Sequence, residues 1–161
     1  MDNITQFIAT PFGRFITTFI TAMMPIIELR GAIPLGVSLG LSHIESMLIS
    51  CVGTMVPVPF IILFARKIFE WMKRKSARLG AFADRMVARA YSTRDVIRKW
   101  QMLGLVVLVA IPLPGTGAWT GALVAAVFNL RMRLALPAIL LGVLIAGVLV
   151  TGITFGSTSI L

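Results

Sequence analysis

Two ionisable residues stand close together inside an apolar stretch of the chain. Glu28 and Arg30 are two residues apart within residues 25–43, and Glu28 is the only acid inside an interrupted apolar stretch. An acid that a membrane shields from water is suited to carrying a proton. A guanidinium group offers a fork of hydrogen-bond donors that matches a phosphate group. The pair therefore predicts a site for a phosphate head group, with a proton or a sodium ion as the coupled partner.

A second apolar stretch, 101–128, is interrupted by proline, glycine and threonine. Thr116 and Gly117 lie where a helix would resume after the interruption. The free N–H groups and the positive dipole at the start of such a helix favour an anion. We therefore expect both interruptions to contribute to one site. The candidates for substrate binding or ion coupling are Glu28, Arg30, Gly31, Pro34, Pro112, Pro114, Gly115, Thr116, Gly117 and Trp119.

Simpler structural roles stay open for the same residues. Glu28 and Arg30 could neutralise each other, or Arg30 could bind backbone carbonyl groups at a helix break. The prolines and glycines could be kinks in helices that cross the membrane completely. Trp119 could be an interfacial or packing residue.

The composition assigns the chain to the membrane. Of its 161 residues, 58% are hydrophobic and 13% are charged, and the mean hydropathy is +0.95. An ordinary soluble domain is about 45–50% apolar and about 25% charged, and at this size it leaves too much surface in water to hide so many apolar residues. The single Cys and single His exclude a disulfide framework and a Cys/His metal site. We expect no metal and no other cofactor.

The net charge of +9 is concentrated in one part of the chain. Eleven of the 15 Lys and Arg residues lie between Arg66 and Lys99. A basic segment between apolar stretches is typical of a cytoplasmic loop, and it attracts anionic lipid head groups. The charge therefore predicts topology and lipid contact, and it argues against nucleic acid as a partner.

The start of the chain predicts a helix followed by a hairpin. Residues 1–24 carry a polar stripe at helical spacing, which indicates an N-terminal helix that either crosses the membrane or lies in its interface. Residues 25–43 are barely long enough to cross about 30 Å of hydrocarbon. Their charges, together with Gly31 and Pro34, lie near the middle of the stretch. We expect a break there, with two short arms forming a re-entrant hairpin whose tip lies near the membrane midplane.

The rest of the chain predicts two spans and a second hairpin. Residues 45–65 cross the membrane, with a kink or break at Pro57 and Pro59, and an amphipathic basic helix follows. Arg131 and Arg133 come directly after 101–128, so that stretch must be a hairpin if all basic regions are to share one side. One membrane domain, 1–161, then has four parts: 1–24, the hairpin and span 25–65, the basic segment 66–99, and the hairpin and span 100–157.

The two halves repeat each other in the sequence. Residues 32–35 and 110–113 have the same four letters, AIPL, and each lies in an interrupted stretch that precedes a span. The first span runs towards the basic loop and the second runs away from it, so the two units are inverted. Inverted repeats with interrupted helices are the architecture of many secondary transporters. We expect an all-α integral membrane protein with two such repeats.

Residues 28–36, ELRGAIPLG, resemble the small multidrug export protein family, and residues 111–117, IPLPGTG, fit the same family. The resemblance covers nearly the whole chain. The family is more distantly similar to the DedA (VTT-domain) proteins, which have two inverted re-entrant hairpins and include transporters of undecaprenyl phosphate. Glu28 matches the acid of their first hairpin. The arginines of their second hairpin are replaced here, which leaves Arg30, with Arg14 as a second candidate cation near the tips.

The resemblance implies translocation of a lipid or lipid phosphate, or export of small compounds. Together with the residues it indicates a transporter or flippase of the inner (cytoplasmic) membrane, coupled to an ion through Glu28. A proton-coupled small multidrug exporter and a membrane scaffold are the alternatives, and a homo-oligomer is compatible with each. We expect no enzyme, because the chain has a single His, near a membrane edge, and no paired acids within its apolar stretches. Residues 66–99 and 129–133 are expected on the cytoplasmic side.

Overall fold

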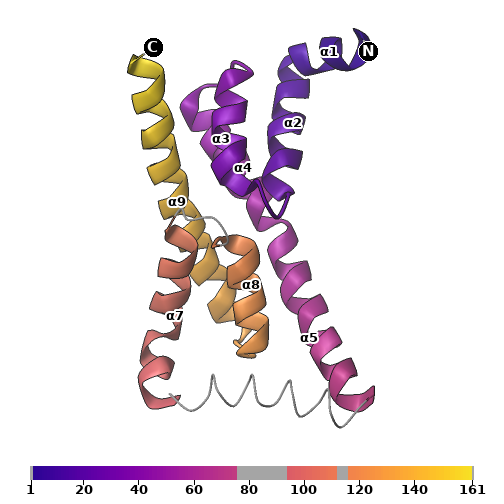
Figure 1. Ribbon diagram of the computed structural model, residues 1–161, viewed down its shortest axis with the longest axis vertical. Helices are drawn as coiled ribbons and strands as arrows, with labels where there is room; N and C mark the ends of the chain where they lie inside the picture. The colour runs from indigo at the N-terminus through magenta and orange to yellow at the C-terminus, as the bar shows by residue number, and fades with distance from the viewer. Residues whose placement is uncertain (1, 76–93, 112–115, 161) are drawn as a thin grey trace.

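The computed structural model describes residues 2–75, 94–111 and 116–160, and all regular structure in these ranges is helical (Figure 1). The helices are α1 (Asp2–Ala9), α2 (Pro11–Met23), α3 (Glu28–Ser38), α4 (His43–Met55), α5 (Pro57–Lys75), α7 (Arg94–Ala110), α8 (Ala118–Val127) and α9 (Met132–Ile160).

Two helical stretches, His43–Lys67 and Met132–Gly156, are long and apolar enough to cross a membrane. Only 33% and 44% of their most apolar windows, respectively, is buried inside the molecule. Much of each stretch therefore exposes apolar side chains on the surface. The core helix of a soluble protein would be mostly buried, whereas a lipid-facing helix needs such an apolar surface. The all-α class is therefore confirmed for the described residues, with two helical stretches that could cross a membrane.

The N-terminal segment consists of two helices rather than one. Thr10 separates α1 from α2, and its hydroxyl oxygen accepts a hydrogen bond from the Gly13 amide at 3.0 Å. Pro11 occupies the first position of α2, where its missing N–H costs nothing. Local capping chemistry thus bends the chain at this point.

The break in the first apolar stretch lies at residues 24–27, so the expectation of a break near Gly31 and Pro34 is wrong. Pro25 ends α2, because the residue before a proline is driven out of the helical region, and Met24 is accordingly extended with ψ 136°. Pro34 lies inside α3 without ending it, as neighbouring helices in a membrane can support such a proline. The two arms are therefore α2 and α3, which run antiparallel (Figure 1).

The first span continues with little interruption through the two prolines. α4 ends at Met55 and α5 begins at Pro57, with the single residue Val56 between them in helical geometry. The expected break at this point is thus confined to one junction. The basic segment begins within α5, which extends to Lys75, and residues 76–93 lie outside the described ranges.

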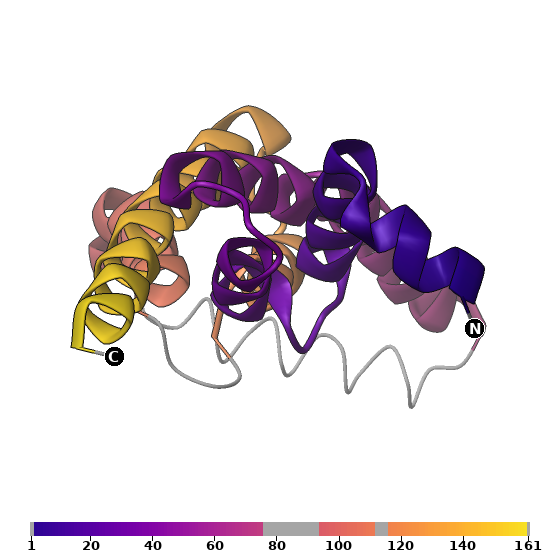
Figure 2. The same ribbon diagram turned by 90° about the horizontal axis from the view of Figure 1, so that it is seen from above.

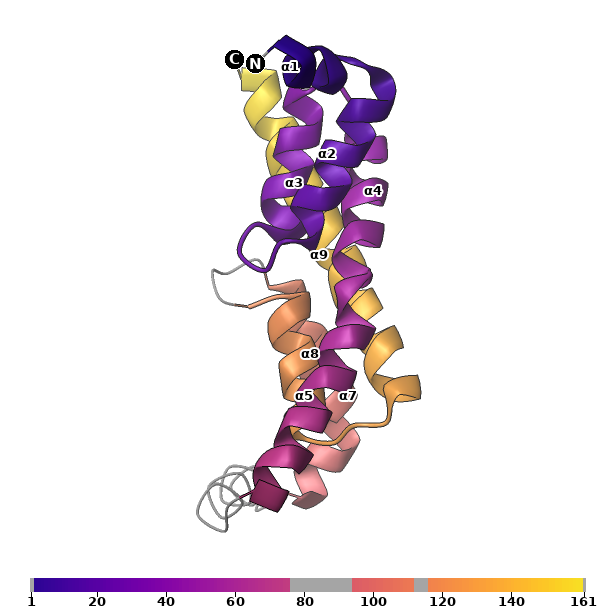
Figure 3. The same ribbon diagram turned by 90° about the vertical axis from the view of Figure 1, so that its right-hand side faces the viewer.

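The second half has the same order of elements as the first. α7 ends at Ala110 and α8 begins at Ala118, so the interruption expected between Ile111 and Gly117 is present, although residues 112–115 lie outside the described ranges. α9 then runs back along the molecule as the second long helix, with Pro137 inside it. The end of α7, the start of α8 and the α2–α3 turn lie near the middle of the long axis (Figure 3).

The short helices α3 and α8 end in the same local structure. Gly40 and Asn129 both have positive φ, 92° and 50°, which is the usual way for a helix to end. In each case the amide of the following residue donates a hydrogen bond to a carbonyl oxygen of the helix. The Leu41 amide binds the Gly36 carbonyl at 3.0 Å, and the Leu130 amide binds the Ala125 carbonyl at 2.9 Å.

This shared ending corrects the alignment that the AIPL match indicates. Residues 32–35 lie within α3, the second arm of its unit, whereas residue 110 is the last residue of α7, a first arm. The matched stretches therefore begin at different positions relative to the helices. Gly40 and Asn129 share their position instead, since each stands three residues before a long helix.

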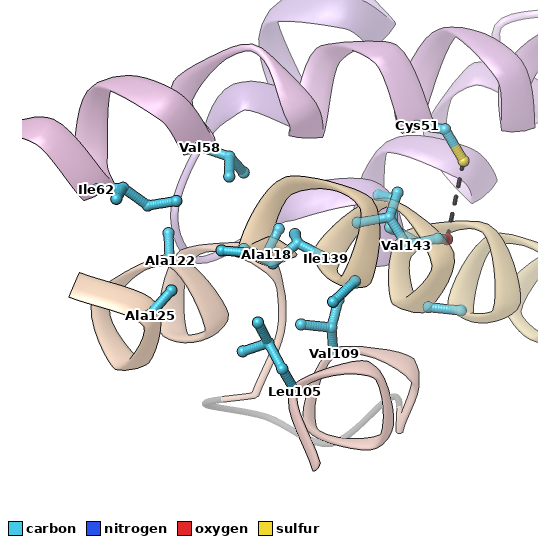
Figure 4. Packing of buried hydrophobic residues seen from close by; sticks show 14 of the residues in the cluster. Cys51, Val58, Ile62, Leu105, Val109, Ala118, Ala122, Ala125, Ile139 and Val143 are labelled. Carbon is cyan, nitrogen blue, oxygen red and sulfur yellow. Dashed lines mark hydrogen bonds between the residues drawn. The ribbon is translucent and has the colours of Figure 1, made fainter. Parts of the chain in front are cut away.

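The core surrounds the two short helices. Seen along the long axis, α3 lies between α2 and α9 (Figure 2). An alanine face of α8 packs against larger residues of α5, α7 and α9 (Figure 4). The alanines are Ala118, Ala122 and Ala125, and their surroundings include Val58, Ile62, Leu105, Val109 and Ile139. Small side chains let the backbone of α8 approach its neighbours closely.

Candidate functional site

Glu28 is a buried carboxylate at the first position of α3. Its side chain is only 4% exposed, and its backbone has φ 49°. The left-handed region costs an L residue roughly 1–2 kcal/mol, so the surrounding structure must hold this residue in place. Carboxylate oxygen Oε1 accepts a hydrogen bond from the Trp119 amide at 3.2 Å. Glu28 therefore joins the start of α3 to the start of α8.

Gly117 leaves the space that this carboxylate occupies. It is the N-cap residue of α8, with φ 139° and ψ −167°, a conformation that is essentially restricted to glycine. A Cβ atom added here would lie 2.8 Å from the carboxyl carbon of Glu28. Any other residue at this position would therefore suffer both backbone strain and a collision with the carboxylate.

Arg30 crosses from α3 to the connection between α7 and α8. Its Nη2 atom donates to the Ile111 carbonyl oxygen and to the Thr116 hydroxyl, both at 3.0 Å. The same hydroxyl donates to the Ile111 carbonyl at 2.8 Å. The simpler role that the sequence leaves open for Arg30, binding a carbonyl group at a helix break, is therefore present.

The structure brings half of the candidate residues into one cluster: Glu28, Arg30, Thr116, Gly117 and Trp119. Gly31 packs against the Ile27 side chain, and Pro34 is exposed farther along α3. The other candidates, Pro112, Pro114 and Gly115, lie outside the described residues. The described residues contain no group of three or more His, Cys, Asp or Glu that could hold a metal ion.

Two further arginines lie at the opposite, C-terminal ends of the short helices. Arg14 lies against Gly40, where an added Cβ would be 2.7 Å from its Nη1 atom. Arg66 donates from Nη2 to the Leu130 carbonyl oxygen. Cations are favourable at this end of a helix dipole. Arg14 therefore belongs to the end of α3 and not to the cluster around Glu28, which corrects its expected place near the tips.

The main feature that sequence reasoning misses is the Ile111 carbonyl, the acceptor that anchors Arg30. A backbone acceptor leaves no signal in the sequence. Pro25, by contrast, carries a readable signal, because it follows an apolar helical stretch and must interrupt it.

The family model described as "Putative small multi-drug export protein" matches residues 28–149. The chain belongs to this family. The match begins at Glu28 and ends in α9, so it includes the whole cluster described above. No curated protein and no solved structure matches the chain. Membership in the small multi-drug export family indicates a membrane export protein, a transporter rather than an enzyme.

Proposed function

We propose that this chain is a multi-pass transporter whose substrate site lies where α3 and α8 begin. The observation that carries the proposal is the Glu28 carboxylate, which is buried and lies on the N-terminus of α8. Intramembrane ionisable residues mark substrate and ion pathways by default. Helix N-termini that meet inside a membrane mark the binding sites of secondary transporters. Glu28 is then the residue that couples transport to a proton or a sodium ion.

In this proposal the pairs α2–α3 and α7–α8 are re-entrant hairpins that enter from opposite sides. The long helices, α4 with α5 and α9, are the spans, so the two halves form inverted repeats. The matching ends at Gly40 and Asn129 support this relationship. Backbone at the two interruptions is tolerated only where protein buries it or water reaches it, which suits a site between the tips.

The proposed orientation places residues 66–99 and 129–133 on the cytoplasmic side of the inner membrane. The hydrogen bond from Arg66 to Leu130 supports a shared side, because it ties α5 to the turn before α9. The basic residues at this end would then follow the positive-inside rule and contact anionic lipid head groups.

We favour an amphiphile with a phosphate group, such as a polyprenyl phosphate, as the substrate. Arg30 and the start of α8 supply positive charge and N–H donors. The alternative is a proton-coupled exporter of small amphiphilic drugs, which the family description favours. A membrane scaffold that transports nothing is a further alternative.

The transport proposal is tested with Glu28→Gln and Arg30→Ala. Proteoliposomes carrying a fluorescent polyprenyl phosphate measure lipid translocation, and export of ethidium from cells measures drug transport. We expect both variants to lose activity in one of the two assays while they remain in the membrane. Glu45→Gln and Lys67→Gln, which change exposed charges, are the matched controls. Full activity of both site variants would refute the assignment, and activity in neither assay for the unmodified protein would favour the scaffold.

The topology is tested separately by thiol labelling from either side of the membrane. Cys51, which is buried, is first replaced by alanine, and single cysteines are then placed at positions 45, 67 and 130. We expect positions 67 and 130 to label from the same side and position 45 from the other. Labelling of 67 and 130 from opposite sides would exclude the second hairpin.

A further inference from the structure

The N-terminus of α8 takes its capping acceptor from another helix. Gly117 has no side chain, and the first turn of α8 contains no acid. By contrast, α2 is capped by Thr10 and α4 by Ser42 with Glu45, all from their own sequence. A helix whose first amides depend on a distant carboxylate can lose that partner without any change in its own sequence.

The space at this position is shaped for an anion. Glycine is the only residue type that leaves room for the Glu28 carboxylate at position 117. Glu28 itself has a left-handed backbone where its carboxylate occupies this space. The carboxylate thus occupies an enclosed position at the positive end of α8.

A second observation points independently to a ligand. The indole Nε1 atom of Trp119 is buried and has no hydrogen-bond acceptor within the part of the chain that the structure describes. A buried donor without an acceptor requires an explanation, and a bound group with acceptor oxygens would provide one. Arg30 adds a permanent positive charge to the same cluster.

We propose, building on the transport function above, that the space over Gly117 binds an oxyanion group of the substrate. The Glu28 carboxylate occupies this space when the substrate is absent, and the substrate's oxyanion displaces it. The substrate's phosphate or carboxylate group and the Glu28 carboxylate need the same α8 amides, so they exclude each other. The donors at this position are the Trp119 amide, which already binds the Glu28 carboxylate, and the Arg30 guanidinium, which is bound to Thr116 beside Gly117. The buried indole N–H belongs to the same residue, Trp119. Such a set recognises an oxyanion and rejects an amphiphilic cation.

The first test asks whether a free carboxylate can replace the side chain. Glu28→Ala in phosphatidylcholine nanodiscs is heated in acetate and, at equal ionic strength, in chloride. We expect saturable stabilisation by acetate, and at ten times the dissociation constant the unfolding equilibrium constant should fall about 11-fold. Glu45→Ala is the matched control, because it also removes a carboxylate that caps a helix, but from an exposed position. Equal responses of the two variants would overturn the proposal.

The second test uses Glu28→Gln and does not depend on the alanine variant folding. Binding of decyl phosphate, inorganic phosphate and decyltrimethylammonium is measured by tryptophan fluorescence, with Trp71 and Trp100 replaced by phenylalanine. We expect Glu28→Gln to bind decyl phosphate about tenfold more tightly than the unmodified site, because an amide competes less well than a carboxylate for N–H donors. The cation should show no such gain. A gain for decyl phosphate alone identifies a lipid-tethered group, and a gain for both phosphates identifies a free oxyanion.

The outcomes separate this inference from the transport proposal. If Glu28→Gln loses transport but gains no affinity for either phosphate, the inference that the Glu28 carboxylate and the substrate's oxyanion exchange is wrong, and the transport site stands. If the variant gains affinity and still transports fully, the anion site stands and the coupling role of Glu28 is wrong.

Discussion

The guanidinium of Arg30 and the hydroxyl of Thr116 lie 3.0 Å apart, although 86 residues separate them in the chain. Together with the hydrogen bond from Trp119 to Glu28, this contact links the start of α3 to the start of α8 and to the residue before Gly117. A movement that separates the two helix ends must break both links. The contacts that form the candidate site are therefore also those that join the two helix ends.

Loss of the Arg30 link should loosen the protein. Arg30→Gln removes a charged donor, and hydrogen bonds to charged groups contribute roughly 1.5–3 kcal/mol. We expect a lower melting temperature in detergent. Lys67→Gln, at an exposed position, serves as the control and should shift stability by no more than about 0.5 kcal/mol. An Arg30→Gln protein as stable as this control would show that the link contributes nothing.

Gly117→Ala should be strongly destabilising. The residue's φ of 139° costs an alanine about 1–3 kcal/mol, and the new methyl group collides with the Glu28 carboxylate. Thermal denaturation measures the effect. Gly104→Ala is the matched control, because nothing lies within 4 Å of the added atom in α7, and it should stabilise by up to about 1 kcal/mol. Similar melting temperatures for the two variants would contradict the geometry at Gly117.

Gly53→Ala should disturb the packing of α4 against α2. The added Cβ would lie 2.7 Å from the Phe19 carbonyl oxygen and 3.0 Å from the Ala22 Cβ. Overpacking of this kind costs roughly 1–3 kcal/mol. Gly152→Ala, in open space on α9, provides the comparison in the same denaturation assay. A stable Gly53→Ala variant would mean that α2 and α4 are farther apart than described.

The two helix ends should respond to substitution in opposite directions. Gly40→Ala places an alanine at φ 92° and against Arg14, which should cost about 1–2 kcal/mol. Asn129→Gly removes the backbone strain of a residue with a side chain at φ 50°. The free energy of unfolding should therefore stay the same or rise. Both effects are read from melting temperatures. Destabilisation by Asn129→Gly would argue against equivalent ends of α3 and α8.

Several properties could be derived from the sequence because their causes are local or compositional. The apolar composition determines the membrane class, and the prolines and glycines between Ile111 and Gly117 determine the second break. Glu28 and Arg30 stand out because charges in apolar stretches are costly. The same reasoning placed the first break wrongly, since Pro25 and Pro34 are both helix breakers and only the surrounding packing decides which one is tolerated.

The tertiary structure alone decided how the candidate residues meet. The acceptor for the Trp119 amide, the Glu28 carboxylate, is 91 residues away in the chain. One acceptor for Arg30 is the Ile111 backbone carbonyl, whose role does not depend on the residue type. The left-handed backbone of Glu28 and the space over Gly117 exist only once α3 and α8 face each other. Sequence patterns reflect preferences over a few residues, whereas these contacts depend on packing across the whole chain. The sequence therefore determined which residues carry charge inside the apolar stretches, and the fold determined that one carboxylate lies on the start of α8.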